Sequence, residues 1–274
     1  MTAAPPGADL LARLRRLFPG ASTRTLRRWL AEGRVRVDGA VVRDGRAPVD
    51  AAQVVALGPR APGAFPAPLR LVHEDADLLV IDKPAGLLTI ATERERERTA
   101  YRLLWDYLGR RSPPRRPFVV HRLDRETSGL LVFATSPAVK RALQAQFEAR
   151  AVERGYVAVV EGRVREDRGR LVGWVAEPGR DRPRRAITEY RVLERRREAT
   201  VLALGLLTGR RHQIRIQLAA LGHPVVGDRR HGRRPSPIRR LCLHATRLGF
   251  RHPATGAPVR FESPAPAAFD RVGR

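Results

Sequence analysis

The residues best suited to chemistry lie in a short charged turn between two apolar segments, VVHRLDRETSGLLVFA, residues 119–134. Asp124 stands in this turn between Arg122 and Arg125, and Glu126 follows closely. Nearby cations favour the ionised form of a carboxylate, which can then act as a nucleophile or as a base. A single turn aspartate is more commonly a capping or salt-bridged residue, so the turn by itself leaves both roles open.

Metal, nucleotide and glycoside chemistry have weaker support in the sequence. The seven histidines form no HExxH pattern, and the single cysteine, Cys242, cannot form a CxxC pair. Neither Lys83 nor Lys140 has the Gly-Lys-Ser/Thr context of a phosphate-binding loop. A glycosidase needs a second, separately placed carboxylate, whereas Glu126 follows Asp124 within the same turn. We therefore expect no metal site and no nucleotide hydrolysis.

The composition predicts an acidic partner. The 274 residues include 53 basic and 28 acidic side chains, a formal net charge of +25, and Lys83 and Lys140 are the only lysines. The flat guanidinium of arginine binds phosphate with two hydrogen bonds and stacks on bases, which favours nucleic acid as the partner. A GC-rich genome also favours arginine, and we regard both explanations as valid. No apolar run approaches the roughly 18 residues of a membrane span, and no secretory signal is evident, so we expect a cytoplasmic protein without membrane association.

The first sixty residues predict a small α+β unit. Apolar residues at helical spacing predict one helix over 10–18 and a second over 22–30. Alternating valines around a tight Asp38-Gly39 turn predict a β-hairpin over 35–42. The second helix and the hairpin carry cations that could bind phosphates or form a solvated polar face, namely Arg24, Arg27, Arg28, Arg34 and Arg36.

A proline- and glycine-rich segment, GPRAPGAFPAPL, interrupts the periodic sequence at residues 58–69. We expect an N-terminal domain over 1–60, a linker over 61–69 and a larger domain over 70–274. Beyond the linker, strand-like runs outnumber helical ones, which is typical of a sheet-rich α+β domain. A helix expected over 136–149 has its apolar residues on one face, and we expect it to pack in the core and carry no chemistry.

Two patterns resemble known families. The segment STRTLRRWLAEGRVRVDG, starting at Ser22, resembles the small RNA-binding domain first known from a ribosomal small-subunit protein, the S-four fold. The string HRLDRETSG resembles the HRLDxxTSG signature of the RluA-type pseudouridine synthases. Further blocks follow that family's order: EDADLLVIDKPAGLL (74–88), RGYVAVVEG (154–162), AITEY (186–190), LLTGRRHQIRIQLAALGHPVVGD (206–228) and LCLHATRLGFRHPATG (241–256). The resemblance implies a pseudouridine synthase fold with a central mixed, mostly antiparallel sheet, plus a small N-terminal α+β RNA-binding domain.

The resemblance also implies a reaction and three catalytic residues. These enzymes detach uracil from its ribose, rotate it and rejoin it through carbon 5, without any cofactor. By motif position, Asp124 bonds to the anomeric carbon or to the uracil ring, and the first route, with a glycal-like intermediate, is favoured for the family. Tyr156 matches the active-site tyrosine, which is expected to pack on the flipped uracil and to assist proton removal at carbon 5. Arg215 matches the arginine that pairs with the catalytic aspartate.

Further RNA contacts follow from the same resemblance. Arg122 is expected to enter the RNA and help displace the target base, with Arg125 beside it. Arg210, His212 and Gln213 are expected to brace the loop and the RNA backbone or simply to form a hydrogen-bonded turn. Lys83 is expected to be a structural or phosphate-contacting residue near the site.

The N-terminal RNA-binding domain favours ribosomal RNA over transfer RNA as the expected partner. The expected oligomeric state is a monomer. A non-catalytic RNA-binding or ribosome-assembly protein on the same fold is the main alternative. Charge and the N-terminal module would be the same in both cases. The presence of Asp124, Tyr156 and Arg215 argues for the enzyme.

Overall fold

The computed structural model describes residues 9–58, 65–111, 113–179, 181–232 and 236–274. The chain divides into two compact units, Met1–Ala64 with Asp106–Arg115 and Phe65–Trp105 with Arg116–Arg274. Residues 61–64 of the predicted linker lie outside the described residues. The domain boundaries at 1–60, 61–69 and 70–274 therefore stay predictions.

The N-terminal unit contains two capped helices. Helix α1 (Leu10–Leu17) begins after Asp9, whose carboxylate accepts a hydrogen bond from the backbone N–H of Ala12. Helix α2 (Thr23–Ala31) begins after Ser22, whose hydroxyl accepts from the N–H of Thr25 in the same way. Such caps satisfy backbone donors that the first helical turn leaves unpaired, so both helices begin where the sequence predicts.

A small antiparallel sheet completes this unit. Strand β1 (Val35–Val37) lies between β2 (Ala40–Val41) and β3 (Val55–Leu57). Asp38 and Gly39 both have positive φ, at 49° and 84°, which makes the tight turn predicted between β1 and β2. Alternate strand residues and one face of each helix form the core, which consists of Leu10, Leu14, Leu26, Leu30, Val35, Val37 and Val49.

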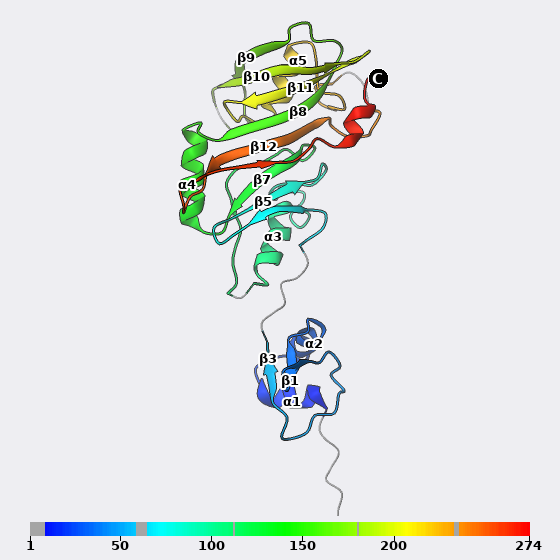
Figure 1. Ribbon diagram of the computed structural model, residues 1–274, viewed down its shortest axis with the longest axis vertical. Helices are drawn as coiled ribbons and strands as arrows, with labels where there is room; N and C mark the ends of the chain where they lie inside the picture. Colours follow the sequence, from blue (N-terminus) through cyan, green and yellow to red (C-terminus); the bar gives the residue numbers. More distant parts are fainter. Residues whose placement is uncertain (1–8, 59–64, 112, 180, 233–235) are drawn as a thin grey trace, which may run out of the picture. The chain divides into compact units, whose positions relative to one another are not determined.

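A ten-stranded sheet dominates the second unit (Figure 1). Its strand order is β4-β5-β7-β12-β8-β11-β10-β9, with β13 paired to β12 and β6 paired to β7. Within the described residues β7 and β12 run parallel and the other pairs are antiparallel. This is the mixed, mostly antiparallel sheet that the sequence predicts. The strands are β4 (Arg70–Glu74), β5 (Leu78–Lys83), β6 (Phe118–Val119), β7 (Ser128–Ala134), β8 (Glu153–Glu161), β9 (Arg168–Val175), β10 (Arg184–Arg195), β11 (Ala199–Leu206), β12 (Leu243–Arg251) and β13 (Pro258–Glu262).

Four further helices follow in the part of the chain that the structure describes. They are α3 (Ala100–Leu108), α4 (Pro137–Glu148), α5 (Gln213–Ala220) and the short 3-10 helix η1 (Ala267–Arg271). Helix α4 packs against β6, β7 and β12, and α5 packs against β9 and β10. Helix α4 is capped by Ser136 and buries Val139 and Leu143 in the same core cluster as Leu130 and Val132 of β7. Its predicted role in core packing is therefore confirmed.

The parallel pairing of β7 with β12 depends on Gly129. This residue lies opposite Ala245 and has a φ of 114°. A Cβ atom at position 129 would lie 2.3 Å from the carbonyl oxygen of Ala245, so only glycine fits without a backbone shift. The close approach brings β12 against the start of β7, directly after the charged turn that contains Asp124.

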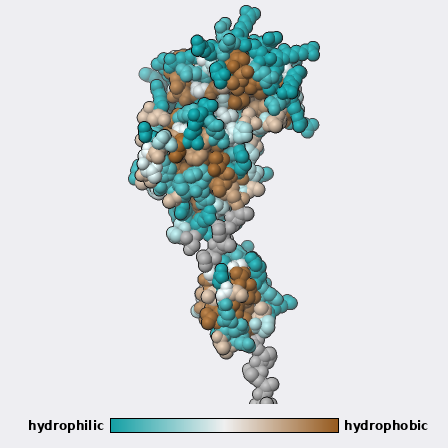
Figure 2. Space-filling model, viewed as in Figure 1, coloured by the Kyte–Doolittle hydropathy of each residue, from teal (hydrophilic) through white to brown (hydrophobic). Residues whose placement is uncertain are grey.

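The surface carries mainly hydrophilic side chains, with apolar patches among them on the face drawn in Figure 2. In the part of the chain that the structure describes, no helix combines the length and apolar character that a bilayer crossing requires.

Candidate active site

Asp124 lies where two cavities of the second unit meet. One cavity has a volume of about 850 Å³ and the other of about 1300 Å³. Both are lined by Asp124 and by the same neighbours, Arg122, His212 and Arg215. The first extends toward apolar and aromatic side chains, and arginines line much of the second. A nucleotide can therefore reach the carboxylate of Asp124 from an open, positively charged surface.

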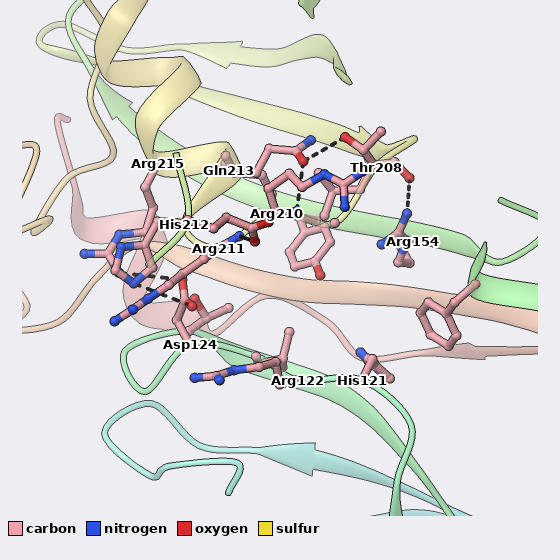
Figure 3. A pocket seen from close by; sticks show the side chains of 18 of the residues that line it. His121, Arg122, Asp124, Arg154, Thr208, Arg210, Arg211, His212, Gln213 and Arg215 are labelled. Carbon is pink, nitrogen blue, oxygen red and sulfur yellow. Dashed lines mark hydrogen bonds and ion pairs between the residues drawn. The ribbon is translucent and has the colours of Figure 1, made fainter. Parts of the chain in front are cut away.

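Two side chains of the α5 region converge on Asp124 (Figure 3). Nη1 of Arg215 lies 3.6 Å from Oδ2 of Asp124, and Nε2 of His212 lies 3.7 Å from Oδ1. The Arg215 side chain is 4% exposed and that of Asp124 is 19% exposed. The predicted pairing of Arg215 with Asp124 thus has the required proximity. Both distances are longer than a strong charge-assisted hydrogen bond, so the carboxylate is held loosely.

A second carboxylate holds Arg215 more tightly. Nε and Nη2 of Arg215 donate to the two carboxylate oxygens of Asp228 at 2.7 and 2.8 Å, and the Asp228 side chain has no exposed surface. Oδ1 of Asp228 also accepts hydrogen bonds from the backbone N–H groups of Arg230 and His231. No local pattern in the sequence marks Asp228, although it closes the 206–228 block, because its partner is 13 residues away and on another element.

The charges of Arg215 and its neighbouring carboxylates stabilise one another's ionised forms. Burial works against the charge of Arg215, but hydrogen bonding and attraction by Asp228, Asp124 and Glu126 outweigh it and raise the pKa of the guanidinium. Burial likewise opposes the charge of Asp228, yet the hydrogen bonds from Arg215 and Arg230 lower the pKa of that carboxyl overall. Both groups therefore stay charged at neutral pH.

His212 occupies a backbone conformation that is uncommon for a residue other than glycine. Its φ and ψ are 55° and 20°, in the left-handed region, at the start of α5. This conformation lets α5 begin directly beside Asp124. Burial lowers the pKa of His212, and the opposing charge of Asp124 does not restore it. The imidazole is therefore neutral at pH 7 and sits at a position of backbone strain, a combination that is common at functional sites.

Tyr156 lies on β8 in the wall of the first cavity, which Asp124 also lines. It is opposite Leu204 of β11 and Ala245 of β12, and only 8% of its surface is exposed. Burial raises the pKa of Tyr156 to about 12, so the phenol keeps its proton at neutral pH. Tyr156 thus offers a flat, mostly buried ring and one polar group near Asp124.

The far end of the first cavity is lined by three residues that were not among the predicted site residues, His121, Phe147 and Arg154. The ring of His121 stacks on that of Phe147 at 4.8 Å, and the guanidinium of Arg154 lies 5.6 Å from the Phe147 centroid. Nε2 of His121 accepts a hydrogen bond from the N–H of Val132, and burial lowers the pKa of His121 to about 3. This end of the cavity is therefore aromatic, with one neutral histidine and one cation.

The structure places two predicted RNA contacts in the interior. Lys83 has no exposed surface, and its ammonium donates to the carbonyls of Pro84, Leu87 and Arg125. Gln213 is 2% exposed and bonds to Thr208, Thr188 and the carbonyl of Ile187. Full burial leaves Lys83 no surface for an RNA contact, whereas Gln213 lines the first cavity with its side-chain amide bonded within the protein. Both side chains brace loops near Asp124, in agreement with the structural roles expected as alternatives for them.

The remaining predicted contacts are accessible. Arg122 and Arg125 are exposed next to Asp124, and Arg125 also donates to the carbonyl of Gly86 at 3.1 Å. Arg210 lines the first cavity and donates to the carbonyl of Arg185. These three side chains can reach a ligand in the cavities.

In the N-terminal unit, Arg24, Arg27, Arg28 and Arg36 are exposed. Arg34 is half-buried, with its guanidinium 5.5 Å from the ring centroid of Trp29. Arg24, Arg27 and Arg28 thus lie on α2, Arg36 lies on β1, and Arg34 directly precedes β1; four of these five arginines are exposed to solvent.

Comparison with known protein families shows which class of protein has this fold and site. The model of the RNA pseudouridylate synthase family matches residues 77–220, and that of the S4 domain matches residues 10–55. The chain belongs to the RNA pseudouridylate synthase family, whose members are isomerases that act on RNA, and it carries an N-terminal S4 domain.

Relatives of similar length share this class. Ribosomal large subunit pseudouridine synthase D of Pseudomonas aeruginosa is 36% identical over 92% of this chain and 87% of its own length. The protein of the same name from Xanthomonas campestris is 36% identical over 94% of this chain and 86% of its own length.

Solved structures support the same fold. Human RNA pseudouridylate synthase domain containing 4 superposes with a TM-score of 0.61 at 22% identity, covering 73% of this chain and 90% of that chain. Human RNA pseudouridylate synthase domain containing 1 superposes with a TM-score of 0.57 at 28% identity, and the match covers 74% of this chain and 85% of that chain. The expected pseudouridine synthase fold is therefore confirmed.

Proposed function

We propose that this enzyme isomerises specific uridines in large-subunit ribosomal RNA and that Asp124 forms the covalent intermediate. The observation that carries the proposal is the position of Asp124 at the junction of the two cavities, with Arg215 3.6 Å and His212 3.7 Å away and Tyr156 in the same wall. The names of the relatives support ribosomal RNA as the substrate.

The geometry supports a carboxylate nucleophile. A carboxylate that bonds to the anomeric carbon must give up its other contacts, and the contacts of Asp124 with Arg215 and with the neutral His212 are long enough to be given up at small cost. As the new C–O bond forms, the bond from the anomeric carbon to N1 breaks and uracil leaves with that electron pair. Rejoining through carbon 5 releases the carboxylate, carbon 5 then gives up its proton, and N1, which left with the electron pair, takes up a proton in its place. Atoms and electrons balance, as an isomerisation requires.

The first cavity supports retention of the detached base. Its volume of about 850 Å³ lies in the range of roughly 300–1,000 Å³ that holds drug-sized ligands, so a uracil ring has room to turn without leaving. Tyr156 supplies a mostly buried surface for packing, which an enzyme that everts a base requires. Arg122 is exposed beside Asp124, which supports a role in filling the gap that the base leaves in the RNA.

The decisive experiment compares the wild-type protein with Asp124→Ala. Each is incubated with total RNA from a strain that lacks the protein, and pseudouridine is mapped at single-nucleotide resolution. We expect new sites in large-subunit ribosomal RNA with the wild type and none with Asp124→Ala. Asp106→Ala, an aspartate of α3 that lines neither cavity, serves as the matched control and should modify the same sites as the wild type.

Other outcomes would change the proposal in definite ways. Equal product from Asp124→Ala would remove the covalent role of Asp124. Sites confined to transfer RNA would change the substrate but keep the chemistry. Absence of pseudouridine in every native RNA, with RNA binding intact, would favour the non-catalytic alternative.

A further inference from the structure

An exposed tryptophan lies on the edge strand β9, outside the cavities at Asp124. Trp174 is 70% exposed, and Val172, two residues earlier, is 54% exposed. Neither residue lines either cavity. Neighbouring large apolar side chains that remain open to solvent commonly mark an interaction surface.

The strand register determines which face of the sheet these residues occupy. Oγ1 of Thr188 on β10 donates to Oε1 of Gln217 on α5 at 2.6 Å, so the Thr188 side chain faces α5. Leu171 lies opposite Thr188 and shares that face. Because side chains alternate along a strand, Val172 and Trp174 lie on the opposite face. This face is turned away from the helix that carries Arg215.

Arginines surround Trp174 on the same face. By the same alternation, Arg168 and Arg170 lie on the face of Val172 and Trp174. On β10, Arg185 lies opposite Trp174 and Arg191 lies opposite Arg168, and all four arginines are exposed. The acidic residue among them is Glu189, which lies 3.9 Å from Arg170. We call this set the β9 face: Arg168, Arg170, Val172, Trp174, Arg185 and Arg191.

We propose that the β9 face binds single-stranded RNA, with Trp174 stacking on an unpaired base and the arginines contacting phosphates. Aromatic and basic side chains on an open sheet surface are a recurring means of binding unpaired nucleotides. Single-stranded RNA offers both a flat base and a negative backbone, whereas a duplex conceals its base faces. The proposal rests on the proposed function only in taking RNA as the partner, and it assigns the RNA a contact away from Asp124.

Charge also decides between RNA and a second copy of the chain. A symmetric dimer through this face would bring its arginines against the same arginines of the other copy. Like charges placed opposite one another oppose association, whereas phosphates relieve the repulsion. The positive charge of the β9 face therefore favours an RNA strand, with its negative phosphates, over a second copy of this basic protein.

The first test measures RNA affinity with the full-length protein. The probe is a fluorescently labelled oligouridine of about twelve nucleotides, compared with a duplex RNA of the same length. We expect Trp174→Ala to weaken oligouridine binding roughly 5- to 50-fold, since base stacking on one aromatic ring contributes on that scale. Trp174→Phe keeps a stacking ring and should bind within about two-fold of the wild type. Duplex binding should change less than oligouridine binding in Trp174→Ala.

Matched variants and a mapping experiment make the result specific. Leu71→Ala removes an exposed apolar residue, 37% exposed, from β4 at the opposite edge of the sheet, and it should bind as the wild type does. Oligouridine containing 4-thiouridine should crosslink to the peptide that contains Trp174. Unchanged affinity in Trp174→Ala, or crosslinks that omit this peptide, would overturn the proposal. A dimer in sedimentation that Trp174→Ala dissociates would instead assign the face to a second copy.

The two proposals fail in distinguishable ways. At saturating RNA, Trp174→Ala should form pseudouridine at the wild-type rate, because Trp174 lines neither of the cavities that meet at Asp124. Asp124→Ala should lose product formation and keep its oligouridine affinity. Loss of affinity in Trp174→Ala would therefore support the β9 face even if the ribosomal RNA substrate proved wrong.

Discussion

The guanidinium of Arg215 donates to Asp228 through Nε and Nη2, and its remaining nitrogen, Nη1, faces Asp124. The two bonds to Asp228 measure 2.7 and 2.8 Å, whereas Nη1 lies 3.6 Å from Asp124 and 3.5 Å from Glu126. Because the guanidinium is planar and rigid, fixing one edge fixes the direction of the other. Asp228 therefore orients the positive charge beside Asp124 without placing that carboxylate in a strong bidentate pair.

Asp228→Asn should reduce turnover more than RNA binding. The amide accepts through one oxygen only, so Arg215 loses part of its support and turns toward Asp124. Since a displacement of about 1 Å at a reacting group can cost about 100-fold, we expect kcat to fall roughly 10- to 100-fold with little change in KM. The measurement is steady-state pseudouridine formation. Asp167→Asn, at a surface aspartate 2.6 Å from Arg195, is the matched control, and an equal loss there would contradict the specific role of Asp228.

Tyr156→Phe should separate packing on the base from chemistry at the phenol. The ring is kept, so RNA affinity should stay within about two-fold of the wild type. If the phenol takes part in proton transfer, product formation should fall roughly 10²- to 10⁴-fold. Tyr190→Phe, at a buried tyrosine of β10, should behave as the wild type. Wild-type turnover by Tyr156→Phe would limit Tyr156 to packing.

The pH dependence of wild-type activity offers a second check on Tyr156. Burial raises the pKa of Tyr156 to about 12, so the phenol stays neutral well above pH 7. We therefore expect no loss of kcat between about pH 7 and 9 from ionisation of this tyrosine. An alkaline inflection in that range that Tyr156→Phe abolishes would show that the phenol ionises far more easily than its burial implies.

Lys83 should make folding stability depend on alkaline pH. Burial lowers the pKa of Lys83 from 10.5 to about 7 in the folded chain. Between these values the unfolded chain binds more protons, so the contribution of Lys83 to the unfolding free energy rises with pH, by at most about 1.4 kcal/mol per pH unit. This gain is lost as the pH falls from about 10.5 to about 7, and below about 7 the contribution is constant because both states bind the proton.

Urea denaturation of the wild type and Lys83→Met at about pH 7 and pH 9.5 measures this contribution. The unfolding free energy of the wild type should increase relative to that of Lys83→Met at the higher pH. Lys140→Met removes the other lysine of the chain and should keep a constant difference from the wild type. A pH-independent difference for Lys83→Met would show that its amine is charged throughout.

Gly129→Ala should destabilise the second unit. The new Cβ would lie 2.3 Å from the carbonyl oxygen of Ala245, and the residue would keep a φ of 114° that only glycine adopts readily. We expect a loss of roughly 3 kcal/mol in unfolding free energy, measured by chemical denaturation. Gly173→Ala, on β9 with no atom within 4 Å of the added Cβ, should change stability by less than about 1 kcal/mol. Similar values for both variants would contradict the steric argument.

Local patterns in the sequence are enough to predict many elements of this fold. Ser22, Gly39 and Ser136 act on neighbours a few residues away, so the caps of α2 and α4 and the turn of the first hairpin could be assigned from the sequence. The HRLDRETSG string likewise selects Asp124 as the candidate nucleophile, and the position of Arg215 in its own motif leads to the pair that the structure brings together.

What only the tertiary structure decides is how side chains from distant segments share one site. Three features depend on residues from separate elements. They are the strong contact between Arg215 and Asp228, the buried positions of Lys83 and Gln213, and the aromatic end of the first cavity. The physical reason is that burial and ion pairing depend on the strand order and on close approaches such as that of Gly129 to Ala245. The types of residue are encoded along the chain, whereas their protonation states and exposure arise from packing.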